Sequence, residues 1–236
     1  MHRFYLTTEP DKEIMIIKDR AMVHQMRDVL RLKKAEKIAF FSDKAEYAGF
    51  DYVAELKGIE AGSVTFMFRE KIENTREPSR KLVLYQSLIK KDNFEWVLAK
   101  ATEVGVSEII PVLSARSEKK SLNQERCDAI LKEAAEQSGR AIIPKLQNVL
   151  FFEKAVEHAR VSGTKTYFAS TSEKENMIRG VGERAVNLFI GPEGGWEERE
   201  VFAAQRIPTF ETISLGRLTL RAETAAVAAS YMLLWG

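Results

Sequence analysis

The sequence predicts two domains, a small β domain followed by a larger α/β domain. Up to about residue 72, short apolar runs alternate with polar turns, and only one stretch has the apolar spacing of a helix. Beyond the polar segment 73–79 (ENTREPS), strand-like runs alternate with helix-like ones, which is typical of a parallel sheet covered by helices. We therefore expect domains at 1–72 and 73–236.

The first domain is expected to be a small β-barrel. Its one helix is predicted over 21–32, where Val23, Met26, Val29 and Leu30 share a face. Its strands are predicted at 2–6, 13–17, 37–41, 47–56 and 64–68.

The second domain is expected to alternate strands and helices. Ser121 is the expected N-cap of its longest helix, and Gly105 and Gly139 are expected to end two helices, because glycine suits the left-handed C-terminal cap. The strands are predicted at 81–87, 109–113, 165–169, 186–190 and 210–215, and the helices at 94–104, 121–138, 151–161, 197–205 and 221–234.

The composition is that of an ordinary globular chain, with 236 residues of which 45% are hydrophobic and 30% charged. The single cysteine, Cys127, excludes an internal disulfide and a multi-cysteine zinc site, and it favours a reducing compartment. The N-terminus has no apolar core of a signal peptide, and no window approaches the ~18 apolar residues of a membrane span. We expect a soluble, cytoplasmic protein without a membrane partner.

The formal net charge of +2 does not by itself indicate a nucleic-acid partner. Basic residues nevertheless cluster at 27–37 and 76–91. Each cluster could bind phosphates, with an affinity that falls as salt rises, or could be a solvated charged face, and the sequence leaves both readings open.

Three loops that follow predicted strands form the candidate ligand site, because ligands of open α/β sheets bind at the carboxyl ends of strands. These loops are 169–172 (ASTS), 191–196 (GPEGGW) and 214–220 (SLGRLTL). The glycine loop matches no phosphate-binding fingerprint, and Glu193, Glu197 and Glu198 would repel phosphate. Its glycines still suit a nucleoside without phosphates, and an ordinary turn is the alternative. No metal-ligand or nucleophile motif is present, so we expect no metal.

The last helix has an unusual composition. Within 222–235 (AETAAVAASYMLLW), Glu223 is the one charged residue, and small residues cover most of the circumference. Such a helix lies either in the core or in a subunit interface, and the sequence does not separate the two.

Two motifs resemble those of a known family. Residues 189–195 (FIGPEGG), followed by 215–225 (LGRLTLRAETA), resemble the paired cofactor-site motifs of the 16S ribosomal RNA uridine-N3 methyltransferases, which belong to the SPOUT superfamily of knotted methyltransferases. The similarity runs from residue 1 to the C-terminus. Further matching segments are MHRFY at 1–5, His24 with VLR at 29–31, KATEVGV at 100–106, SARS at 114–117 and EQSGR at 136–140.

The resemblance implies a fold and a function. It implies a PUA-like RNA-binding β-barrel over 1–72 and a SPOUT-type α/β domain with a deep trefoil knot over 73–236. It also implies S-adenosylmethionine as methyl donor, a homodimer, and methylation of N3 of a specific uridine in 16S ribosomal RNA of the small subunit. The alternatives are the same chemistry on another RNA, such as transfer RNA, and a non-catalytic RNA-binding ribosome factor.

The resemblance also implies site residues. Because the uridine imide must lose its proton, Glu193 and Glu223 are candidate bases, and Arg221 and Arg140 are candidates for stabilising the uracil anion. Glu223 could instead only interact with the dipole of its helix. The expected cofactor-binding residues are Ser170, Thr171, Ile190, Gly191, Pro192, Gly194, Gly195, Ile213, Leu215, Gly216, Leu218, Leu220 and Thr224. The expected RNA-binding residues are Arg3, Arg27, Arg31, Lys33, Lys91 and Arg116.

Overall fold

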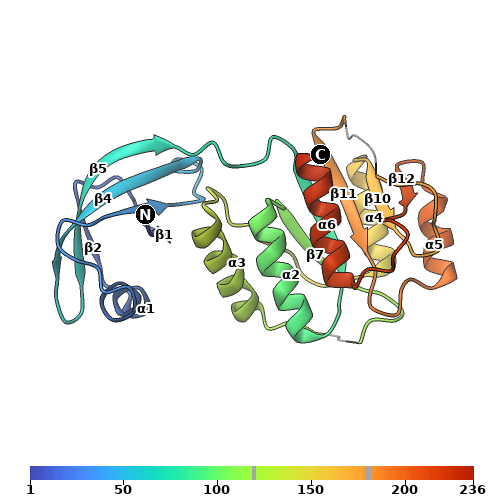
Figure 1. The fold of residues 1–236 in the computed structure, drawn as a ribbon, viewed down its shortest axis with the longest axis horizontal. Helices are drawn as coiled ribbons and strands as arrows, with labels where there is room; N and C mark the ends of the chain where they lie inside the picture. Colours follow the sequence, from blue (N-terminus) through green and yellow to red (C-terminus); the bar gives the residue numbers. More distant parts are fainter. Residues whose placement is uncertain (119–120, 179–181) are drawn as a thin grey trace. The chain divides into compact units, whose positions relative to one another are not determined.

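The computed structural model describes residues 1–118, 121–178 and 182–236, which form two compact units (Figure 1). Unit 1 comprises Met1–Glu77 and Ala135–Ile142, and unit 2 comprises Pro78–Ala134 and Ile143–Gly236. Unit 1 therefore contains a second segment from much later in the chain, which a boundary placed from sequence patterning alone does not anticipate.

Unit 1 is built on a five-stranded sheet that curls into a half-barrel (Figure 1). Strands β1 and β3 are parallel, and the other neighbours are antiparallel. The sheet closes around an apolar core that includes Phe4, Phe40 and Phe66. The strand order is β1 (Arg3–Tyr5), β3 (Lys37–Phe41), β4 (Phe50–Ile59), β5 (Val64–Glu73) and β2 (Ile14–Ile17).

The predicted helix of unit 1 is a short α-helix that runs into a π-helical turn. Helix α1 spans Arg20–His24, and the turn η1 spans Gln25–Val29. Val23 and Met26 are buried as predicted, whereas Val29 is 64% exposed. The wider π-helical turn rotates the following side chains away from the face that a regular helix would give them.

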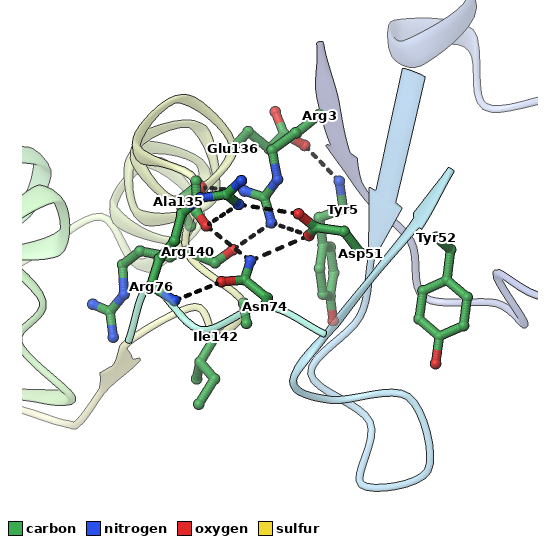
Figure 2. A network of polar contacts seen from close by, with 12 residues as sticks. Arg3, Tyr5, Asp51, Tyr52, Asn74, Arg76, Ala135, Glu136, Arg140 and Ile142 are labelled. Atoms are coloured by element: carbon green, nitrogen blue, oxygen red, sulfur yellow. Dashed lines mark hydrogen bonds and ion pairs between the residues drawn. The ribbon is translucent and has the colours of Figure 1, made fainter. Parts of the chain in front are cut away.

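A buried polar network lies at the edge of this sheet, with Asp51 at its centre (Figure 2). The carboxylate of Asp51 accepts hydrogen bonds from Arg3 Nη2 at 2.6 Å, Arg76 Nη1 at 3.1 Å and Asn74 Nδ2 at 3.2 Å. The Arg3 and Asp51 side chains are only 8% and 7% exposed. Asn74 and Arg76 lie in the segment predicted as a linker, so part of that segment is ordered by buried contacts.

The same network binds segment 135–142 into unit 1 (Figure 2). Arg3 donates to the carbonyl oxygens of Ala135 and Arg140, at 3.2 and 2.8 Å. The Glu77 carboxylate accepts from Arg140 Nη2 at 2.8 Å and from the backbone N–H of Ala141 at 2.9 Å. Buried backbone groups left without partners would cost about 1–3 kcal/mol each, so these contacts explain why the segment belongs to unit 1.

Unit 2 contains a seven-stranded parallel sheet. Its five longer strands lie where the sequence predicts them. The two-residue strands β8 and β9 were not predicted, because runs so short carry no periodic signal. The order is β12 (Phe210–Ile213), β10 (Thr166–Ala169), β11 (Ala185–Ile190), β6 (Lys81–Ser87), β7 (Glu108–Leu113) and β8 (Lys145–Leu146), and β9 (Leu150–Phe151) also pairs with β7.

Helices cover both faces of this sheet (Figure 1). Helices α2 (Lys91–Val104) and α6 (Ala222–Trp235), together with α3 (Gln124–Ser138), pack on the face that carries Leu82 and Leu84. Helices α4 (Phe152–Ser162) and α5 (Glu198–Gln205) cover the other face, where the rings of Tyr85 and Phe189 stack 4.2 Å apart. None of the helices in the described part of the chain has the length and apolar character needed to cross a membrane.

Helix α6 has a buried side and an exposed side. Ala226, Ala229 and Leu233 are fully buried, in the core shared with α2 and β6. Tyr231 and Trp235 are 57% and 51% exposed. The structure thus makes α6 a core helix along one side and leaves Tyr231, Met232 and Trp235 exposed.

The longest helix begins later than the sequence predicts. Helix α3 starts at Gln124, and the side-chain oxygen of Asn123 accepts a hydrogen bond from the backbone N–H of Arg126 at 3.0 Å. Asn123 is therefore the N-cap, and the assignment of Ser121 to that position is wrong. Both residue types cap helices well, so residue preference alone does not choose between the two positions.

Replacing Asn123 by alanine should lower the free energy of unfolding by about 1 kcal/mol, because α3 loses its capping acceptor. Ser121→Ala should change it by less than about 0.5 kcal/mol, as is usual for an exposed site. Urea unfolding followed by tryptophan fluorescence measures both values. Equal effects of the two substitutions would contradict the cap assignment.

Candidate functional site

A cavity of about 670 Å³ lies in unit 2, at the carboxyl ends of three neighbouring strands. Strands β12, β10 and β11 are adjacent in the sheet, so the loops that follow them meet at one edge. The start of α6 and residues near the N-terminus of α2 complete the walls. The lining comprises residues 169–171, 173–174, 190–196, 214–223 and 225, together with Lys90 and Asn93. The three loops singled out in the sequence therefore form one site.

Trp196 shapes the glycine loop. Its ring is 8% exposed and stacks on Phe168 at 4.8 Å, and its indole N–H donates to the carbonyl of Ala169 at 2.9 Å. A Cβ atom on Gly191 would lie only 3.1 Å from this indole, so glycine lets the backbone lie against the ring. The sequence analysis placed Trp196 in the glycine loop but gave it no role, because no spacing distinguishes a tryptophan that shapes a loop from one in the core.

Asn176, which follows the first loop, forms hydrogen bonds with the end of β12 and the start of the third loop. Its Nδ2 donates to Glu211 Oε1 at 2.9 Å and to the carbonyl of Thr212 at 2.8 Å, and its own carbonyl accepts from the backbone N–H of Ser214 at 2.7 Å. Hydrogen bonds from Lys165 and Asn176 lower the pKa of Glu211, so this carboxylate is anionic at neutral pH. These contacts hold two walls of the cavity in a fixed relation.

Two of the three carboxylates that line the cavity in the described part of the chain are bound by the protein itself. Hydrogen bonds from the backbone N–H groups of Glu175 and Asn176 lower the pKa of Glu173. Glu193, one of the two candidate bases, accepts a hydrogen bond from the backbone N–H of Lys90 at 3.2 Å. The structure therefore gives Glu193 a role at the N-terminus of α2.

Glu223, the other candidate base, is different. Its side chain is 13% exposed, and its Oε2 atom is buried without a hydrogen-bond partner among the described residues. Its Oε1 atom lies 3.9 Å from Arg221 Nη1, too far for a hydrogen bond. Glu223 thus has a buried carboxylate oxygen that is left for a ligand.

Four basic side chains also line the cavity, and they are those of Lys90, Lys174, Arg217 and Arg221. All four residues are exposed, and the Arg221 side chain is 84% exposed. The site therefore combines a buried carboxylate with solvent-facing cations. The sequence analysis gave a role in the site only to Arg221. Lys90 was included only in the basic cluster 76–91, Arg217 only in the third loop, and Lys174 in neither.

All but two of the expected cofactor-binding residues line the cavity. The exceptions are Ile213 and Thr224. Ile213 is fully buried, and its carbonyl accepts a hydrogen bond from the backbone N–H of Ser170 at 3.1 Å. Thr224 is exposed on α6, outside the lining. Ile213 thus supports the first loop rather than facing the cavity.

Two arginines that were expected to contact uracil or RNA are buried in ion pairs inside unit 1. The Arg140 side chain is 6% exposed and pairs with Glu77 at 2.8 Å. Arg3 is buried against Asp51, and its guanidinium also lies over the ring of Phe41. These placements correct the sequence-based expectation, because a guanidinium buried in such contacts is not presented to RNA.

The other expected RNA-binding residues are exposed. Arg31, Lys33 and Lys91 lie on the surface, and Arg27 pairs with Asp28 at 2.8 Å while remaining 40% exposed. Arg116 donates to the carbonyl of Gly194 at 2.8 Å, which places it beside the glycine loop.

A cavity walled by a glycine loop and two further loops, at the carboxyl ends of parallel strands, is typical of an α/β protein that binds a small ligand. A family model for the RNA methyltransferase domain matches residues 75–234, which include every residue of the cavity. The Ribosomal RNA small subunit methyltransferase E of Mesomycoplasma hyopneumoniae is 34% identical over 163 residues, which cover 67% of this chain and 71% of the relative. The protein of the same name from Bacillus subtilis is 30% identical over 223 residues, covering 88% and 84%. The chain belongs to the Ribosomal RNA small subunit methyltransferase E family.

Solved structures agree with this assignment. The crystal structure of a Ribosomal RNA small subunit methyltransferase E from Neisseria gonorrhoeae, bound to S-adenosyl methionine, covers 98% of this chain and 95% of its own. It superposes with a TM-score of 0.86 at 29% identity. A methyltransferase structure from Legionella pneumophila, also with bound SAM, gives a TM-score of 0.86 at 26% identity and covers 98% and 96%.

Proposed function

We propose that this chain uses S-adenosylmethionine to methylate N3 of a specific uridine in the 16S ribosomal RNA of the small subunit. The observation that carries the proposal is the cavity of unit 2, because both motifs of the family resemblance line it. The names of the relatives support a small-subunit RNA substrate, and the structure from Neisseria gonorrhoeae supports the cofactor.

The residues of the cavity fit S-adenosylmethionine. A volume of about 670 Å³ suits a nucleoside with an amino-acid side arm, since small-molecule sites typically measure ~300–1,000 Å³. This cofactor has positive charges and no phosphate, which suits the buried carboxylate of Glu223 in the cavity wall. We propose that the backbone around Gly191, Leu215 and Leu218 holds the adenosine, and that Ser170 and Thr171 lie near the methionine end.

The reaction places two demands on the protein. Bound S-adenosylmethionine would supply an electrophilic methyl group, so that N3 forms a bond to carbon while the sulfur keeps the electron pair of the broken S–C bond. The loops must hold the acceptor in line with that bond. N3 must also lose its proton to solvent, and we propose that Arg221 and Arg217 favour this loss by stabilising the negative charge on the uracil oxygens.

The RNA contacts and the assembly belong to the same proposal. A structured RNA would be recognised mainly by shape and phosphates, with the acceptor base turned out of its stack. Arg27, Arg31 and Lys33 in unit 1, and Lys91 and Arg116 in unit 2, are the exposed cations that we propose contact it. We also propose a homodimer, which the exposed apolar side of α6 supports, and the trefoil knot that the family resemblance implies.

Reverse transcription across 16S RNA tests the substrate, because methylation at N3 blocks Watson–Crick pairing. Small subunits incubated with the protein and S-adenosylmethionine should give one new stop at a uridine, absent when the cofactor is omitted. The stop should weaken as salt rises, because phosphate contacts are screened. No stop on small subunits together with methyl label in transfer RNA would move the substrate to that RNA. Absence of any cofactor binding in calorimetry would favour a non-catalytic factor.

A further inference from the structure

Among the lining carboxylates of the described residues, Glu223 is the one with a buried oxygen that has no hydrogen-bond partner. Glu173 and Glu193 each accept hydrogen bonds from backbone N–H groups, whereas Oε2 of Glu223 has no partner among the described residues. A buried carboxylate oxygen without a partner loses its hydration without compensation, which costs about 1–3 kcal/mol or more. The position of Glu223 therefore needs a reason beyond the stability of unit 2.

The immediate surroundings do not supply the missing partner. Arg221 lies 3.9 Å from the other oxygen, and its side chain is 84% exposed and therefore well hydrated. The first turn of α6 offers the favourable field of a helix N-terminus. No backbone N–H in the described part of the chain donates to Oε2, so the helix field acts on this oxygen without a hydrogen bond.

Exposure separates the groups that RNA can reach from those that a small ligand can reach. Leu218 and Arg221 are 81% and 84% exposed, whereas the Glu223 side chain is 13% exposed. A polynucleotide meets the exposed groups first, while a molecule that enters the cavity meets Glu223. The carboxylate is thus better placed to contact the cofactor than to remove a proton from the uridine.

We infer that Glu223 binds a cationic group of the cofactor, and this inference rests on the function proposed above. S-adenosylmethionine carries two such groups, the α-ammonium and the sulfonium. A charge-assisted hydrogen bond to the ammonium, or an ion pair with the sulfonium, would give Oε2 its partner. Glu223 is then a cofactor-binding residue, and the assignment replaces its expected role as the base.

Calorimetry with three ligands and the full-length protein tests this assignment. S-adenosylmethionine carries both cations, S-adenosylhomocysteine keeps only the ammonium, and 5′-methylthioadenosine has neither. In Glu223→Gln, which keeps the shape of the side chain, the Kd for S-adenosylmethionine should rise about 10- to 100-fold. The Kd for 5′-methylthioadenosine should stay within about twofold of the wild-type value. The control is Glu157→Gln on α4, which should leave the ratio of the two affinities unchanged, because Glu157 lies outside the cavity lining and its side chain is 52% exposed.

The third ligand identifies the cation. A loss shared by S-adenosylmethionine and S-adenosylhomocysteine assigns Glu223 to the ammonium, and a loss confined to the former assigns it to the sulfonium. If Glu223→Gln does not fold, Glu223→Asp, which keeps the charge, should retain the preference for S-adenosylmethionine over 5′-methylthioadenosine. Equal losses for all three ligands, or unchanged affinity for S-adenosylmethionine, would overturn the inference. Failure of the wild-type protein to bind S-adenosylmethionine would instead overturn the proposed function.

Discussion

Arg221→Ala should lower the rate of methyl transfer by a factor of about 10²–10³, which is the usual cost of removing one charge-stabilising group from an active site. The reason is the position of the Arg221 guanidinium. Arg221 lines the cavity, and its side chain is 84% exposed, so it lies where an acceptor base would enter. Single-turnover transfer to small subunits at saturating cofactor measures the effect. The affinity for the cofactor and the unfolding midpoint should stay close to the wild-type values, because the side chain packs against little else.

The pH dependence separates this role from a loss of RNA binding. A cation beside the uracil oxygens lowers the pKa of N3, so its removal raises that pKa and moves the rising limb of the rate profile to higher pH. Arg221→Ala should therefore recover part of its rate as pH increases. The control is Arg160→Ala on α4, where the guanidinium is 54% exposed and pairs with Glu157, and it should transfer normally. Near-normal turnover of Arg221→Ala would remove this residue from the mechanism.

Asp51→Ala should destabilise unit 1 by about 3–5 kcal/mol, the usual cost of removing one partner from a buried ion pair. The substitution leaves the Arg3 guanidinium buried without its carboxylate, and Asn74 and Arg76 lose the same acceptor. All three tryptophans, Trp96, Trp196 and Trp235, lie in unit 2, so tryptophan fluorescence does not report on this change. Hydrogen exchange of peptides from β1 and β3, measured at several urea concentrations, gives the local free energy.

Glu55→Ala on the same strand is the matched control. Glu55 pairs with Lys57 and Arg69, whose side chains are 33% and 37% exposed, and pairs of this kind contribute about 0–1 kcal/mol. Comparable effects of the two substitutions would mean that the Asp51 network contributes no more to the free energy of unfolding of unit 1 than a surface ion pair does. The comparison also tests whether Arg3 has a structural role. If Arg3 only contacted RNA, the loss of its partner Asp51 would not lower the stability of unit 1 through Arg3.

Much of the fold could be predicted because its signals are local. Apolar runs located the long strands of both sheets, and the helix ends at Gly105 and Gly139 follow from a conformation that glycine adopts readily, with φ of 105° and 85°. Short strands such as β8 escape detection, because two residues show no period. The choice between Ser121 and Asn123 as N-cap depends on where the backbone turns, which neither side chain determines alone.

The candidate site, like the fold, could be predicted from the sequence only in part. The loops around Gly191 and Leu215 could be located, since they follow strands and carry family motifs. Whether a particular arginine is buried or exposed could not be predicted, because the residue type alone does not determine burial. Arg3 and Arg140 are buried only because Asp51 and Glu77, distant in sequence, lie opposite them. Trp196 likewise enters the site through its contact with Gly191, a relation that spacing does not encode.

The two-segment make-up of unit 1 has a consequence for synthesis on the ribosome. Domains generally begin to fold as they emerge, starting from the N-terminus. Here the first 77 residues emerge before the carbonyl groups of Ala135 and Arg140 that Arg3 binds. The N-terminal sheet must therefore wait for a later part of the chain before its charged centre is complete. Translation pauses that occur before residue 142 leaves the ribosomal exit tunnel should prolong the period in which nascent unit 1 is sensitive to protease, whereas pauses after its exit should not.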